Sequence, residues 1–199
     1  MNHPFMSRLR DSIQDLHDQA QDTAPLDAIL SRSITQPEYT AVLGRLYGFT
    51  VPLETLLDRS LRGFELNHPY SDLMRAPDLY KDLIYFGVTG NELRNMPQAR
   101  LPSTLELPAA LGMLYLMEGS RLGGIIIARN LEDCLGLGPD CGTAYFSSYG
   151  KDPHALKDDF DRQLVSWVAM TREDDAVING ARDGFAALIA WMNAMERSH

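Results

Sequence analysis

The sequence predicts an all-α protein that folds as a single domain. Apolar residues recur at spacings of three and four along most of the 199 residues, whereas the strict alternation of a β-strand is scarce. Hydrophobic residues make up 45% of the chain and charged residues 23%, which is typical of a globular protein with its own core. No internal repeat or linker interrupts the pattern. We therefore expect one domain over residues 1–199, with seven or eight helices and no sheet.

Four helices are expected in the first half of the chain. Their predicted ranges are Ser7–Asp22, Leu26–Ser33, Pro37–Leu61 and Pro77–Phe86. Ser7 is a suitable N-cap for the first of them, and Thr35 caps the third, which opens on Pro37. Pro52 lies inside the third helix, so a kink near Phe49 and Thr50 is expected.

The second half is expected to contain a long central helix and two further helices. Pro97 and Pro102 indicate that Asn91–Ser103 is a loop. The helix ranges predicted after that loop are Thr104–Leu135, Pro153–Met170 and Glu173–Glu196. A turn rich in glycine and proline, Gly136–Tyr149, separates the first two of these helices.

Composition excludes several classes of partner. The net charge is −9 and no run of Lys or Arg is present, so neither nucleic acid nor an anionic membrane surface is expected to bind. The longest apolar run, Leu107–Met117, is shorter than the ~20 residues that a bilayer requires. Met1–Arg10 lacks the apolar core of a secretion signal, and the two cysteines fit a reducing compartment. A soluble, cytoplasmic protein is expected.

His17 is the first candidate for chemistry. It lies at the border of the apolar face of the first helix, on the same side as Arg10 and Gln21. A metal-ligating imidazole requires a hydrogen-bond acceptor on its other nitrogen, and Gln21, four residues later, is placed to supply one. Arg10 precedes His17 by about two turns, or ~10 Å. The alternative is a partly buried helix histidine with no ligand.

Three glycines form the second candidate. Gly119, Gly123 and Gly124 lie within six residues of a helix that is otherwise rich in Leu and Met. Each glycine costs about 1 kcal/mol relative to alanine, so a compensating role is expected. Without a Cβ, the helix can bend and lay bare backbone against a flat ligand. The alternative is close helix–helix packing through Gly119 and Gly123.

Together these segments resemble a known family. The run from Tyr115 to Gly124 resembles the distal-helix signature of bacterial haem oxygenases, particularly those associated with bacteriophytochromes. The run from Leu9 to Gln21 is similar to their proximal helix, and the stretch from Glu38 to Glu54 is similar as well. The resemblance extends from about Leu9 to the last helix.

The resemblance implies a role for each matching residue. His17 would be the proximal ligand of the haem iron, and Arg10 and Tyr115 would each meet a propionate of the haem. The glycine segment would line the distal face, with Gly119, Ser120 and Gly123 acting in catalysis and Gly124 contributing to haem binding. Arg162 is a further candidate partner for a propionate.

Two positions depart from the family pattern. Gln21 stands where many members carry a glutamate, so the imidazole would have a neutral partner. Ser120 follows the first distal glycine, as in the bacterial pattern, where the mammalian pattern has an acidic residue, so an ordered water would do more of the proton delivery. Glu118, beside the distal glycines, is expected to be a solvated or paired surface carboxylate, and the alternative is a catalytic acid.

The implied activity is the oxidation of haem to biliverdin, with release of CO and iron. It would use O2 and electrons from a ferredoxin or a reductase. The biliverdin would serve as chromophore precursor for a bacteriophytochrome, or the reaction would serve iron acquisition. The alternatives are a non-catalytic haem carrier on the same scaffold and a thiaminase-like hydrolase, which would require a cysteine nucleophile in the core.

Overall fold

Helices account for nearly all regular structure in this computed structural model, which describes residues 3–147 and 153–194. They are α1 (Pro4–Gln21), α2 (Ala24–Leu30), α3 (Gln36–Ser60), α4 (Ala76–Tyr85), α5 (Gly90–Asn95), α6 (Leu107–Leu135), α7 (Ala144–Ser147), α8 (Pro153–Thr171) and α9 (Asp174–Asn193), with a 3-10 turn at Tyr70–Asp72. Over the described ranges, β-pairing is limited to isolated bridges from Gly138. The predicted all-α class is confirmed.

Helix ends follow local capping chemistry. Thr35 caps α3, and Glu38 completes a reciprocal capping box, as a Thr followed by Glu three residues later favours. The helix then continues across Pro52 to Ser60. In α1 the predicted start is three residues late, because the His3 side chain, not Ser7, caps the helix and Pro4 occupies its first turn.

Two short helices lie inside segments that were predicted to be irregular. α5 begins with a capping box between Thr89 and Glu92, which outweighs the prolines that follow it. α7 lies within the predicted turn and is held by the buried Asp82 carboxylate, which accepts hydrogen bonds from the Ala144 and Tyr145 amides at 2.8 Å. α6 begins at Leu107 instead of Thr104.

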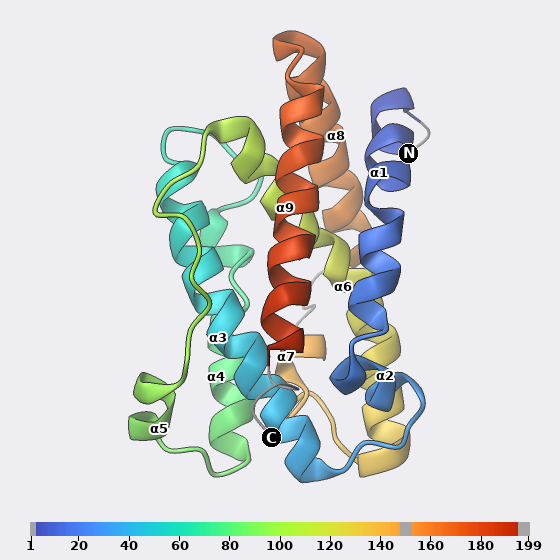
Figure 1. The fold of residues 1–199 in the computed structure, drawn as a ribbon, viewed down its shortest axis with the longest axis vertical. Helices are drawn as coiled ribbons and strands as arrows, with labels where there is room; N and C mark the ends of the chain where they lie inside the picture. Colours follow the sequence, from blue (N-terminus) through green and yellow to red (C-terminus); the bar gives the residue numbers. More distant parts are fainter. Residues whose placement is uncertain (1–2, 148–152, 195–199) are drawn as a thin grey trace.

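The central helix α6 packs closely against α9. Figure 1 shows α9 along the length of the molecule, with α1 beside it and α6 behind. A Cβ on Gly112 would lie 2.1 Å from the Val177 carbonyl oxygen, and one on Gly180 would lie 2.3 Å from the Ala109 carbonyl oxygen. These two glycines, and not Gly119, therefore permit the close helix contact.

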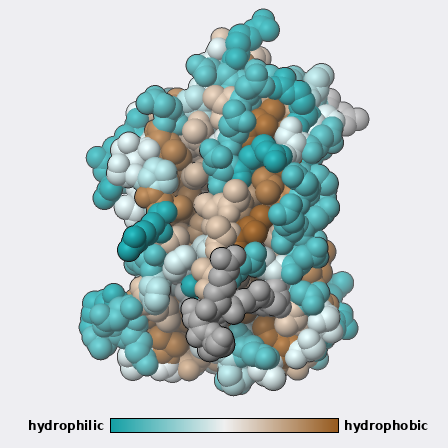
Figure 2. All heavy atoms as spheres, in the orientation of Figure 1, coloured by the Kyte–Doolittle hydropathy of each residue, from teal (hydrophilic) through white to brown (hydrophobic). Residues whose placement is uncertain are grey.

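α6 also has the length and apolarity of a membrane span, yet 61% of its most apolar window is buried inside the protein. The core forms two clusters, one around α1, α6, α8 and α9 and one around α2 and α4, and α3 contributes residues to both. Figure 2 shows hydrophobic residues along the middle of one face, between hydrophilic margins.

Candidate functional site

A cavity of about 560 Å³ lies where the two core clusters meet. Its walls come from α1, α2, α3, α6, α8 and α9, together with Arg75 and the α7 residues Tyr145 and Phe146. Aliphatic and aromatic side chains line most of it, and the volume is within the range of about 300–1,000 Å³ that is usual for small-molecule sites. The arrangement suits a large apolar ligand with a few polar groups.

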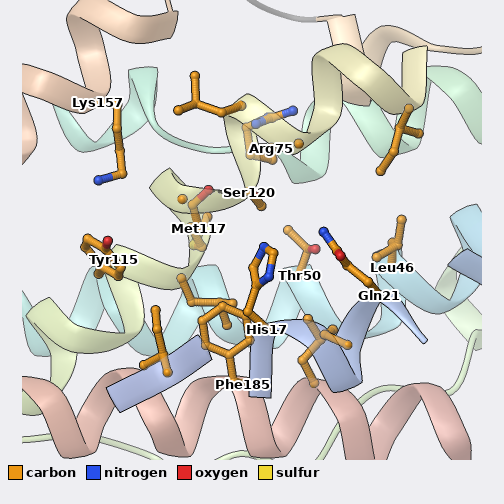
Figure 3. Close-up of a pocket in the computed structure, with 18 of the residues that line it drawn as sticks. His17, Gln21, Leu46, Thr50, Arg75, Tyr115, Met117, Ser120, Lys157 and Phe185 are labelled. Carbon is orange, nitrogen blue, oxygen red and sulfur yellow. Dashed lines mark hydrogen bonds between the residues drawn. The ribbon is translucent and has the colours of Figure 1, made fainter. Parts of the chain in front are cut away.

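The imidazole of His17 extends from α1 into this cavity. Figure 3 shows it pointing toward the part of α6 that carries Ser120. Its side chain is 47% exposed, and the Phe185 ring lies edge-on to it at 6.2 Å between centroids. The Nδ1 atom is 3.4 Å from an Asp18 carboxylate oxygen. Gln21, the acceptor expected from the sequence, lines the cavity, but the acceptor beside the ring nitrogen is Asp18.

The facing wall is bare backbone. Gly119, Ser120 and Gly123 all line the cavity, and a Cβ added at either glycine would have no neighbour within 4 Å. The Ser120 hydroxyl donates to the Met117 carbonyl oxygen at 2.7 Å, which leaves its oxygen lone pairs available to a water. Gly124 is buried and is not among the residues that line the cavity. The open space over two glycines fits a flat ring laid on α6.

One end of the cavity is polar. Figure 3 shows Lys157 and Tyr115 at this end, away from Gln21 and Leu46. Arg10 hydrogen-bonds to the Tyr115 hydroxyl. Burial and the nearby Asp161 raise the pKa of Tyr115 to about 12, although Arg10 opposes the shift, so the phenol keeps its proton at neutral pH. Arg10 and Tyr115 can therefore donate to an anionic group of a ligand.

Lys157 is a cavity residue that the sequence reasoning missed. It forms a buried ion pair with Asp161, four residues later on α8. The available signal was a Lys and an Asp on the same helical stripe as the apolar residues Phe160 and Leu164, where charges are rare. Arg162, the residue proposed from the sequence, lies outside the cavity and pairs with Asp159 at 3.0 Å.

Arg75, just before α4, was also missed. It is 4% exposed, lines the cavity, donates to the Tyr145 carbonyl oxygen and lies 4.7 Å from the centre of the Tyr145 ring. Behind it, the Glu54 carboxylate accepts hydrogen bonds from the Arg75 and Ala76 amides. Burial raises the pKa of Glu54 above its usual value.

Glu118 corrects an expectation. Its side chain is 1% exposed and pairs with Arg121 at 2.7 Å, so it is a buried and not a surface carboxylate. The pair has i, i+3 spacing on α6 and lies outside the cavity lining. It therefore contributes to holding the fold beneath the glycine segment.

Solved structures share this architecture. The chain has a TM-score of 0.70 and 18% identity to haem oxygenase-1 of the cyanobacterium Synechocystis in complex with haem, over 98% of this chain and 93% of that one. For the haem oxygenase of Leptospira interrogans the values are 0.79 and 17%, over 96% and 100%. For the NO- and CO-bound haem oxygenase of Neisseria meningitidis they are 0.74 and 19%, over 96% and 90%. These likenesses define the class of fold as haem oxygenase-like.

The sequence defines the family. A family model described as Heme oxygenase matches residues 3–194, and the chain belongs to the haem oxygenase family. No curated protein sequence matches it. A domain of unknown function from Shewanella denitrificans shares the fold, with a TM-score of 0.71 and 13% identity over 99% of this chain and 94% of that one. Activity must therefore be argued from the site.

Proposed function

We propose that this protein cleaves haem oxidatively to biliverdin, releasing CO and iron and using O2 and external electrons. One observation carries the proposal: the His17 imidazole lines the same cavity as the bare backbone of Gly119 and Gly123, and it points toward the part of α6 that carries Ser120 (Figure 3). A flat ring between them would have a nitrogen ligand on one side and room for a small second ligand on the other.

The chain's own residues have distinct tasks in this proposal. Asp18 near Nδ1 orients the His17 ring and leaves Nε2 for the iron. A neutral histidine ligand lacks the strong electron push by which a thiolate favours O–O cleavage. Bound haem supplies the oxygen activation. The Gly119 and Gly123 backbone would restrict the distal space, and Ser120, whose oxygen lone pairs remain available, would hold a water that can donate a proton.

The polar end of the cavity is where the haem propionates would lie. Arg10 and the Tyr115 hydroxyl are cavity-lining donors for one carboxylate. An electron donor such as a ferredoxin or a reductase completes the reaction, and a bacteriophytochrome is a candidate recipient of the biliverdin. A cytoplasmic location, where such donors and haem are available, belongs to the same proposal.

Haem titration and turnover test the proposal. Purified protein should form a complex with a Soret band, and His17→Ala should abolish or shift that band. His68→Ala is a matched control, because His68 pairs with Asp159 outside the cavity lining. Adding ascorbate or a ferredoxin reductase system in air should replace the Soret band with the absorption of biliverdin, and chromatography should identify the product.

The outcomes separate the alternatives. A stable Soret band under reducing, aerobic conditions would refute catalysis and favour a haem carrier. Indifference of the protein to haem would refute both readings. A band that survives unchanged in His17→Ala would refute the assigned iron ligand.

A further inference from the structure

An ion pair occupies the polar end of the cavity. The Lys157 and Asp161 side chains are 11% and 6% exposed, and their charged atoms are in direct contact. The Lys157 ammonium also lies 4.3 Å from the centre of the Tyr115 ring. Lys157 is therefore fixed in place by a carboxylate of the protein and by an aromatic face.

Both cations and carboxylates line the polar end of the cavity. The cavity-lining cations from α1 and α8 are Arg10 and Lys157, and the cavity-lining carboxylates of α8 are Asp158 and Asp161. A cluster of cations alone would attract a dicarboxylate such as haem. Here the Lys157 ammonium already has a buried carboxylate partner in Asp161, whereas the Asp158 side chain is exposed and screened by water. The attraction of Lys157 for a further carboxylate is therefore reduced by Asp161.

Burial makes the competition at Lys157 strong. A substrate carboxylate that approaches Lys157 must share the ammonium with Asp161, in a place where water screens their mutual repulsion poorly. Arg10 and Tyr115 differ from Lys157 in this respect, because the Arg10 guanidinium donates to the phenol oxygen and the phenol proton stays available to a substrate carboxylate. One substrate carboxylate fits beside Arg10 and Tyr115, whereas Asp161 already occupies the position beside Lys157 that a second substrate carboxylate would take.

We propose that Asp161 is an internal counter-ion that occupies the place of a substrate carboxylate at Lys157 and thereby weakens the binding of tetrapyrroles with two ionised carboxylates. This inference rests on the proposed haem site and names a residue that sets its specificity. Asp161 makes the site favour substrates with a single carboxylate at this end, relative to a site with a free lysine.

The test compares haem with its dimethyl ester, by Soret titration of the full-length protein at neutral pH. Asp161→Asn removes the negative charge and keeps the shape of the side chain. It should lower the Kd for haem by about tenfold or more, because one like charge in a buried site is worth at least about a pKa unit. The Kd for the dimethyl ester should change by less than about twofold.

Asp158→Asn is the matched control. It makes the same change of charge one helical position after Lys157, but its side chain is exposed and water screens it. Its effect on haem affinity should be at most about twofold. An equal fall in the Kd for haem in both variants would show that the net charge alone sets the affinity, and it would overturn the role of Asp161. An unchanged or higher Kd for haem in folded Asp161→Asn would also overturn it.

A second variant covers the case in which Asp161→Asn does not fold. Replacing the pair as a unit, with Lys157→Met and Asp161→Leu, avoids a buried unpaired charge. Because the Lys157 charge is already balanced by Asp161, Lys157 contributes little to haem binding, and this double variant should bind haem within about threefold of the wild type. A loss of tenfold or more would show that Lys157 holds a carboxylate in spite of Asp161. Wild-type protein that binds no haem would instead refute the proposed function, and this inference with it.

Discussion

Replacing Gly119 and Gly123 together by alanine is expected to stabilise the haem-free protein and to weaken its binding of haem. Both glycines lie within α6, where glycine costs about 0.5–1 kcal/mol relative to alanine. An added Cβ would meet no atom within 4 Å at either position, so no steric penalty offsets the gain. The free energy of unfolding should therefore rise by about 1–2 kcal/mol.

The two added methyl groups project into the space assigned to the ring. A ligand that lies directly on the α6 backbone must move away from it, so the Kd for haem should rise while the apo protein becomes more stable. Gly112→Ala on the same helix is the control, because its Cβ would lie 2.1 Å from the Val177 carbonyl oxygen and 2.6 Å from the Ala181 amide nitrogen. It should destabilise the protein by about 1–3 kcal/mol through overpacking.

Urea unfolding of the haem-free variants measures the first effect, and Soret titration measures the second. A higher free energy of unfolding together with weaker haem binding would indicate that the glycines serve the ligand at a cost in stability. A double variant that unfolds more easily than the wild type, or that binds haem with the same Kd, would refute the reasoning. Close helix packing at Gly119 and Gly123 would give the first of these results.

The remaining stability predictions concern buried carboxylates. Glu118→Ala breaks the buried ion pair with Arg121 and should lower the free energy of unfolding by about 3–5 kcal/mol, whereas Asp58→Ala, which breaks an exposed pair, should cost less than about 1 kcal/mol. Similar losses in urea unfolding would contradict the burial of the first pair. Burial raises the pKa of Glu54 above the 4.5 that is usual for a glutamate. At a pH above 4.5 the unfolded chain therefore releases a proton that the folded protein retains, and the free energy of unfolding falls as the pH rises. Glu54→Gln should therefore gain stability relative to the wild type as the pH rises above 4.5, and a difference that stays constant across a pH series would be the contrary finding.

Much of the fold could be predicted because helical periodicity and capping are local. The long helices follow from apolar residues spaced three and four apart, and the Thr35 cap follows from the Glu three residues later. α5 was missed because two prolines outweighed the Thr89 and Glu92 capping box in the prediction, although the box lies just before them. α7 was missed because its first amides are held by Asp82, whose position depends on the tertiary fold.

The site was predictable where a residue type is rare in its setting. Glycines within an apolar helix and a histidine at the border of an apolar face both stand out in the sequence. Lys157 did not, because its position on the cavity wall depends on how α8 packs against α1 and α6. The same holds for Arg75, which reaches the cavity from a segment between helices.

A structure of the protein with haem bound tests the central claim most directly. We predict that the iron is coordinated by Nε2 of His17 and that the opposite face of the ring lies on the backbone of Gly119 and Gly123. Iron held by any other residue, or haem bound outside this cavity, would contradict the account.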